Sequence, residues 1–229
     1  MSPSPYTLPQ RLTAEAVGTA LLLAAIVGSG IMGDTLAGGN TAIALLANTV
    51  ATAAALITLI STLGPVSGAH FNPVVSLSEA WNGGLSWREA ALYVVVQTVS
   101  AVAGVLLAHA MFDLPLLQAS THIRSGASQW LSEGVATFGL LAVIAGCARF
   151  RPADIPVAVA AYITSAYWFT ASTSFANPAV TLARSVTNTF AGIRPADVPG
   201  FMLAQFGGAI VATLLAAWLF TPSGTRARR

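Results

Sequence analysis

Two stretches of the sequence, Ser67-Gly-Ala-His70-Phe-Asn72-Pro73-Val74 and Thr173-Ser-Phe-Ala-Asn177-Pro178-Ala179-Val180, share one pattern. In each, an Asn-Pro pair follows a small polar segment and precedes a short, mostly apolar run. Asn is a favoured helix N-cap, and Pro suits the first helical position, because its missing N–H would have no partner there. Each stretch therefore predicts the start of a helix.

The chain around these motifs has the composition of a membrane protein. Only 8% of its 229 residues are charged and 55% are apolar, whereas soluble domains average about 25% charged residues. Uncharged windows hold most of the sequence, and most approach the roughly 20 residues that a membrane helix needs. We therefore expect an all-α integral membrane protein with a single domain over residues 1–229. This composition excludes nucleic-acid binding and most enzyme classes, and we expect no catalytic residue, metal site or cofactor.

Six windows predict transmembrane helices: residues 11–33, 41–63, 87–111, 129–148, 155–171 and 199–220. The two Asn-Pro segments do not fit this series. Gly64-Pro65-Val66-Ser67-Gly68 predicts a helix break, and the part that follows, Ala69 to Glu79, is too short to cross a bilayer. Residues 172–188 repeat this situation. We expect two re-entrant half-helices, which are tolerated only where their open backbone faces protein or a watery cavity.

The sequence also contains an internal repeat. Glu15-x-Val17-x-Thr19 recurs as Glu133-x-Val135-x-Thr137, and Gln97 recurs as Gln205, in the same order as the Asn-Pro motifs. The copies cover about 11–111 and 129–220, and each contains three predicted spans. Because three is odd, the copies must have opposite orientations in the membrane. Inverted repeats with interrupted helices at matching positions indicate a transport site near the bilayer midplane.

This inversion brings the two Asn-Pro helix starts together near the bilayer centre. Two positive helix-dipole ends and two Asn side-chain amides would meet there. A neutral solute then finds hydrogen-bond donors, whereas a cation or a relayed proton meets a barrier.

The arginines predict the orientation, because cytoplasmic loops carry an excess of basic residues. Seven fall on the side of the two termini and three on the other: Arg11, Arg88, Arg149, Arg151, Arg226, Arg228 and Arg229 against Arg124, Arg184 and Arg194. Both termini are therefore predicted to be cytoplasmic.

Together, Ser67 to Val74, Asn177-Pro178-Ala179 and the paired Glu15 and Glu133 resemble the aquaporin and aquaglyceroporin family. The resemblance runs from about Leu12 to Phe220. It implies a homotetramer in a lipid bilayer, with one pore in each subunit. It also implies that Glu15 and Glu133 accept hydrogen bonds from the re-entrant loops, with a proton relay as the alternative role. His70 would line the cytoplasmic half of the pore, and a pH gate there is a second interpretation.

The same resemblance points to four filter positions. Family members with a tight water filter carry an Arg three residues after the second motif Asn, where this sequence has Val180. Counting by the family's spacing places the others at Thr52, Ser165 and Ser174. Such a filter has no aromatic ring, imidazole or guanidinium, so we expect a wide, hydroxyl-lined constriction. Arg184 lies one helical turn beyond Val180 and is either a displaced vestibule cation or a residue that reaches the interface or pairs within the loops.

A narrower resemblance involves the run Tyr167 to Phe175 and the segment Arg184 to Asp197, which look like a bacterial aquaglyceroporin subgroup of arsenic-resistance operons. It implies a bacterial inner-membrane channel for neutral solutes such as arsenous acid and related arsenicals, glycerol and water. The alternatives are a secondary transporter, and a general glycerol and water channel without an arsenic role. An intramembrane enzyme is disfavoured, because the sequence offers no nucleophile paired with a base.

Overall fold

The computed structural model describes residues 5–220, and all regular secondary structure in that range is helical. The α-helices are α1 (Leu8–Leu36), α2 (Thr41–Ser67), α3 (Pro73–Trp81), α4 (Trp87–Met111), α5 (Ala127–Phe150), α6 (Ile155–Phe169), α7 (Pro178–Ala183) and α8 (Val198–Leu219). Three short 3-10 helices complete the set: η1 (Pro152–Asp154), η2 (Arg184–Val186) and η3 (Pro195–Asp197). The predicted all-α class, with long helices and two half-helices, is confirmed.

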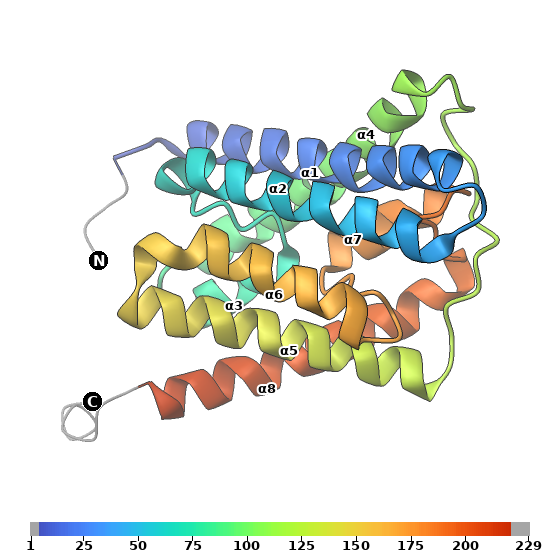
Figure 1. Cartoon of the computed structure of the whole chain (residues 1–229). Coiled ribbons are helices and arrows are strands. Elements are labelled where there is room, and N and C mark those ends of the chain that lie inside the picture. The colour runs from blue at the N-terminus through green and yellow to red at the C-terminus, as the bar shows by residue number, and fades with distance from the viewer. Residues whose placement is uncertain (1–4, 221–229) are drawn as a thin grey trace, which may run out of the picture.

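The long helices form one elongated bundle, and the short helices α3 and α7 lie within its length (Figure 1). α1 begins and α8 ends at the same end of this bundle (Figure 1). Within residues 5–220, five helices are long and apolar enough to cross a membrane, namely α1, α2, α4, α5 and α8 extended by η3. α6 occupies the sixth predicted span with 15 residues, about 22 Å at 1.5 Å per residue, less than the roughly 30 Å of a bilayer core.

The internal repeat is visible in the packing. α1 packs on α2 and α4, and α5 packs in the same way on α6 and α8. Glycine permits the closest approach in each copy: a Cβ atom on Gly104 would lie 2.2 Å from the Ala20 carbonyl oxygen. A Cβ atom on Gly208 would lie 2.2 Å from the Gly134 carbonyl oxygen. Small residues at contacts between membrane helices allow the backbones to approach this closely. Both copies of the repeat therefore pack two of their helices through a glycine.

One predicted boundary needs correction. The span expected to end at residue 63 continues through Pro65 to Ser67. Pro65 removes one backbone hydrogen-bond donor near the end of α2, but the helix continues past it. The helix ends at Gly68, which adopts a left-handed φ of 90° and donates its N–H to the Gly64 carbonyl.

The re-entrant loops before α3 and α7 have matching unusual backbones. Ala69 and Phe71 have φ values of 48°, and their repeat equivalents Ser174 and Ala176 have φ values of 52° and 48°. Non-glycine residues seldom adopt this left-handed region and need support from surrounding structure.

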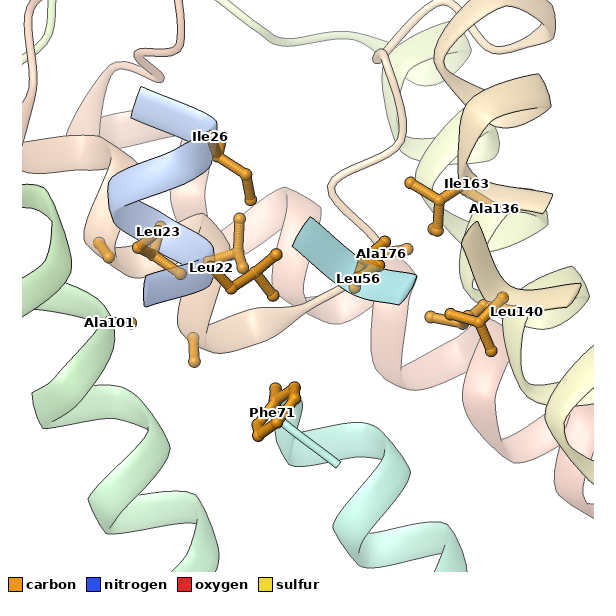
Figure 2. Close-up of a cluster of buried hydrophobic side chains, with 14 of the residues drawn as sticks. Leu22, Leu23, Ile26, Leu56, Phe71, Ala101, Ala136, Leu140, Ile163 and Ala176 are labelled. Carbon is orange, nitrogen blue, oxygen red and sulfur yellow. The ribbon is translucent and has the colours of Figure 1, made fainter. Parts of the chain in front are cut away.

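Around the loops lies one apolar cluster, in which Leu22, Leu56 and Leu140 from three helices approach Phe71 and Ala176 (Figure 2).

Candidate channel pore

The interior contains a cavity of about 260 Å³ lined by both copies of the repeat. α1, α2, α5 and α6 supply apolar walls such as Leu22, Leu56 and Ile163. The two re-entrant loops add polar lining residues, namely His70, Asn72, Ser174 and Asn177. A cavity with apolar walls and a few fixed polar groups suits a small polar solute.

The two Asn-Pro motifs hold each other. Asn72 Nδ2 donates to the Ala176 carbonyl at 2.8 Å, and Asn177 Nδ2 donates to the Phe71 carbonyl at 2.8 Å. Each Asn also caps its own half-helix: Asn72 Oδ1 accepts from Val74 N, and Asn177 Oδ1 accepts from Ala179 N and Val180 N. Both half-helices therefore begin at the motifs, with Pro73 and Pro178 as their first residues. The two Asn side chains face the cavity with fixed orientation.

Glu15 fixes the first re-entrant loop from α1. Its carboxylate accepts hydrogen bonds from Ser67 Oγ at 2.7 Å, His70 N at 2.9 Å and Phe71 N at 2.8 Å. Gln97 Nε2 of α4 donates to the same carboxylate at 2.9 Å and to Ser76 Oγ at 2.9 Å. Glu15 is fully buried, and it is satisfied because every group around its oxygens is a donor.

Glu133 fixes the second re-entrant loop from α5. It accepts from Phe175 N at 2.8 Å and Ala176 N at 2.9 Å. Gln205 Nε2 of α8 donates to it at 2.6 Å and to Thr181 Oγ1 at 2.7 Å. The left-handed loop residues are thus held by one buried carboxylate and one Gln in each repeat.

Three of the four filter residues expected from the sequence line the cavity: Thr52, Ser174 and Val180. The fourth, Ser165, does not. Its side chain is exposed on the outer surface of α6, and its hydroxyl donates to the Tyr162 carbonyl at 2.7 Å. α6 instead presents Ile163 and Tyr167 to the cavity. The expectation for Ser165 is therefore wrong.

The error has a simple geometric cause. Two residues along an α-helix correspond to a rotation of about 200°, so Ser165 and Tyr167 face nearly opposite directions. The segment 170–177 between α6 and α7 is non-helical, and its length cannot be deduced from a fixed count. The Tyr167 hydroxyl lies 3.3 Å from Thr52 Oγ1 and donates to it. The expected absence of an aromatic ring from the filter is therefore also wrong.

Ser174 presents a free hydroxyl to the cavity. The residue is 3% exposed, and its Oγ has no hydrogen-bond partner within the described part of the chain. Val180, on the first turn of α7, adds a small apolar wall. Thr52, Tyr167 and Ser174 thus supply three hydroxyl groups to the cavity wall. Thr52 and Val180 supply methyl groups.

Arg184 also lines the cavity, one helical turn beyond Val180. Its side chain does not reach the membrane interface, because the residue is only 3% exposed. Arg184 Nε donates to the Ala191 carbonyl, and its guanidinium carbon lies 3.4 Å from the centroid of the Phe175 ring. Arg124 approaches the same ring at 5.0 Å.

The lining residues that the sequence reasoning missed include Tyr167, Phe175 and Glu79. Phe175 could have been found from the repeat, because it stands in the second motif where His70 stands in the first. His70 itself lines the cavity, with Nδ1 at 3.0 Å from Ser76 Oγ and its ring centroid at 5.4 Å from that of Tyr93. Glu79 could have been found in the same way, because it stands seven residues after Asn72, as Arg184 stands seven residues after Asn177.

Two half-helices that start from facing Asn residues, inside an inverted repeat of membrane helices, define an aquaporin-type channel. The chain belongs to the major intrinsic protein family, whose model matches residues 4–151. It is therefore a multi-pass membrane channel and not an enzyme.

Individual relatives agree with this assignment. The chain is 57% identical over 218 residues to the aquaglyceroporin AqpS of Rhizobium meliloti (strain 1021), covering 95% of this chain and 93% of that protein. It is 30% identical to the aquaporin NIP2-2 of Zea mays, covering 95% and 72% of the two chains. The structure of the aquaglyceroporin from Plasmodium falciparum matches with a TM-score of 0.68 at 16% identity, over 94% and 96% of the chains. That structural match shows the fold alone, and the family resemblance of the sequence is confirmed.

Proposed function

We propose that this chain is a passive channel for small neutral solutes with several hydroxyl groups, namely arsenous acid and glycerol, together with water. The observation that carries the proposal is the lining around Val180. Thr52, Tyr167 and Ser174 place hydroxyl groups there, and Val180 adds neither the bulk nor the charge of an arginine. The 57% identity to a protein named an aquaglyceroporin supports a solute larger than water.

The hydrogen-bonding pattern explains why such a solute would pass. A hydroxyl is both donor and acceptor, so it can exchange partners with the free Ser174 hydroxyl and with Tyr167 and Thr52. Farther along the cavity, the Asn72 and Asn177 amides are held as donors. Uncharged arsenous acid, with three hydroxyl groups, resembles glycerol in this respect.

Arg184 would act as the vestibule cation of this pore. Its charge is fixed by Phe175 and Ala191 one turn farther out than the usual family position. A fixed cation beside a cavity with apolar walls repels other cations. His70 and the filter residues Thr52, Ser174 and Val180 would set the width and polarity along the same path.

The buried acids Glu15 and Glu133 would support the loops and would not relay protons. Their oxygens are occupied by loop N–H groups and Gln amides. This arrangement also disfavours a secondary transporter that uses Glu15 or Glu133 as its ionisable coupling group.

A homotetramer is the assembly that we propose. The outward face of α2 carries small and hydroxyl residues, Ala47, Ala54, Thr58 and Ser61, and the outward face of α6 carries Ala161 and Ser165. Such residues favour close contacts between membrane helices. The exposed position of Ser165 is thereby explained as an interface between subunits.

We place the channel in a bacterial inner membrane with both termini in the cytoplasm. α1 begins and α8 ends at the end of the bundle where α5 ends and α6 begins (Figure 1). Arg149, in the last turn of α5, and Arg151, directly after α5, are exposed. Arg226, Arg228 and Arg229, which contributed to the predicted orientation, lie outside the described residues.

Flux measurements test the proposal. Proteoliposomes would be mixed in a stopped-flow instrument with a hyperosmotic solution. An impermeant osmolyte would report water flux, and glycerol or arsenous acid would report flux of that solute. We expect fast, non-saturating, downhill flux of all three. Water flux with exclusion of both larger solutes would overturn the wide filter, and glycerol flux without arsenous acid flux would favour the general glycerol channel. Saturable uptake against a gradient would establish the secondary transporter.

A further inference from the structure

A second hollow lies on the outside of the bundle, where α3 meets α8 and the start of α4. This α3–α8 groove has a volume of about 300 Å³, and its walls include Leu77 and Trp81 of α3, Trp87 of α4, and Phe206, Ile210 and Leu214 of α8. The two hydroxyl residues in it, Ser78 and Thr213, hydrogen-bond to each other at 2.8 Å. Thr213 also donates to the Ala209 carbonyl. The groove therefore offers an apolar surface and little to a polar ligand.

The groove opens on the outer surface of the helix bundle. Its rim residues Trp81, Trp87 and Ile210 are 63%, 58% and 59% exposed. α3 ends at Trp81 and α4 begins at Trp87, and tryptophans at helix ends commonly mark the membrane surface. One end of the groove is therefore at the level of the lipid headgroups, and the other, at Val74, is near the bilayer centre.

The length of the groove fits one lipid tail. Its floor is α3, whose nine residues span about 13 Å at 1.5 Å per residue. One leaflet of the hydrocarbon core is about 15 Å thick. Arg88, next to Trp87, is exposed and takes part in none of the ion pairs among the described residues. It offers a cation at the level where a lipid phosphate would lie.

We propose that the α3–α8 groove binds one acyl chain of a membrane phospholipid, with the phosphate of that lipid near Arg88. A second copy of the chain is a poorer occupant, because the α2 and α6 faces proposed for assembly do not contribute to this groove.

The site would bear directly on the pore, because α3 separates the two. Val74 lines the groove and the next residue, Val75, lines the pore cavity. A half-helix of nine residues makes few contacts of its own, and an acyl chain packed along it would complete its apolar surroundings. Bound lipid would therefore hold the Asn72 end of α3 in place.

Adjacent residues of α8 provide a matched pair of variants. Ile210 lines the groove, whereas Val211 has similar exposure, at 57%, and does not line it. We expect Ile210→Phe to fill the groove and Val211→Phe to leave it open. Purified proteins that elute as the same oligomer would be compared by native mass spectrometry for phospholipid retained after detergent washing.

The expected result is about one retained phospholipid per subunit in the parent and in Val211→Phe, and at least a tenfold loss in Ile210→Phe. Equal retention in both variants would overturn the site. A second measurement does not depend on folding of a variant in the groove. With Trp130, Trp168 and Trp218 replaced by Phe, the remaining Trp81 and Trp87 report quenching by phospholipids brominated on the acyl chain.

Quenching should saturate at a low fraction of brominated lipid. A simple proportional dependence on that fraction would show non-selective lipid contact and refute the site. Arg88→Gln should remove any preference for phosphatidylglycerol over phosphatidylcholine, and an unchanged preference would refute the phosphate position. These outcomes are separate from the proposed solute, since no flux is measured.

Discussion

Arg184 lies over the ring of Phe175, with its guanidinium carbon 3.4 Å from the ring centroid, and both residues line the pore cavity. A desolvated cation–π contact of this kind contributes about 2 kcal/mol. The contact fixes a positive charge one helical turn outward from Val180. The family pattern would place that charge at position 180 itself. The proposed wide filter therefore has a fixed cation beside it.

Removal of this charge should weaken the barrier to cations. We expect Arg184→Ala to admit protons at least about fivefold faster than the parent, because a fixed charge near a low-dielectric wall contributes about 1 kcal/mol or more to the barrier. Proteoliposomes loaded with a pH-sensitive dye would measure this leak. Arg149→Ala, at an exposed position that does not line the cavity, is the control. An unchanged leak in Arg184→Ala would sink the vestibule role.

An arginine at position 180 should narrow the pore. Val180→Arg adds a long side chain with five donors at the filter, so we expect glycerol flux to fall about tenfold or more while water flux falls less. Val180→Met adds length without charge and separates the two effects. Stopped-flow light scattering measures both fluxes, and equal losses for water and glycerol would contradict a size filter at this position.

Tyr167 and Ser165 provide a direct test of which residue of α6 belongs to the filter. Tyr167→Leu removes the hydroxyl that bonds Thr52, and we expect a several-fold change in the ratio of glycerol to water flux. Ser165→Leu should leave that ratio unchanged and weaken the oligomer, because Ser165 faces outward. Flux ratios and size-exclusion profiles would be compared. A changed ratio in Ser165→Leu alone would return Ser165 to the filter.

The loop-supporting acids should matter for stability. Glu15→Gln places an NH₂ group where loop N–H donors now point, and each hydrogen bond to a charged group contributes about 1.5–3 kcal/mol. We expect a loss of about 3 kcal/mol or more, seen as a large fall in the thermal unfolding temperature in detergent. A proton relay predicts a different outcome: a stable variant whose solute flux no longer responds to a pH gradient.

Two adjacent glycines of α8 separate close packing from helix propensity. A Cβ atom on Gly208 would meet the Gly134 carbonyl oxygen at 2.2 Å, whereas nothing lies within 4 Å of a Cβ atom on Gly207. Gly208→Ala should force α5 and α8 apart and cost about 1–3 kcal/mol. Gly207→Ala should be neutral or stabilise by up to about 1 kcal/mol. Thermal unfolding of both variants measures the difference, and equal effects would contradict the repeat-related contact.

Much of the fold follows from short-range patterns in the sequence. Uncharged windows locate the long helices, because few charges can be placed in a bilayer core, and the Asn-Pro pairs locate the two half-helices, because capping is decided within a few residues. The repeat of Glu15 and Glu133 ties those loops to particular helices. Helix ends were less well predicted, as Pro65 within α2 shows, since the left-handed Gly68 and not the proline ends that helix.

The sequence by itself thus determined the family, the inverted repeat and the identity of the residues that hold the re-entrant loops. Only the tertiary structure decided which side chains line the pore wall. An error of two residues across the non-helical segment before Asn177 turns α6 by about 200°, and this exchanges Tyr167 for Ser165. The position of the Arg184 charge depends on Phe175 and Ala191, which come from different parts of the second loop region. Capping and hydropathy act locally along the chain, whereas a pore wall is assembled from segments whose relative rotation no local pattern fixes.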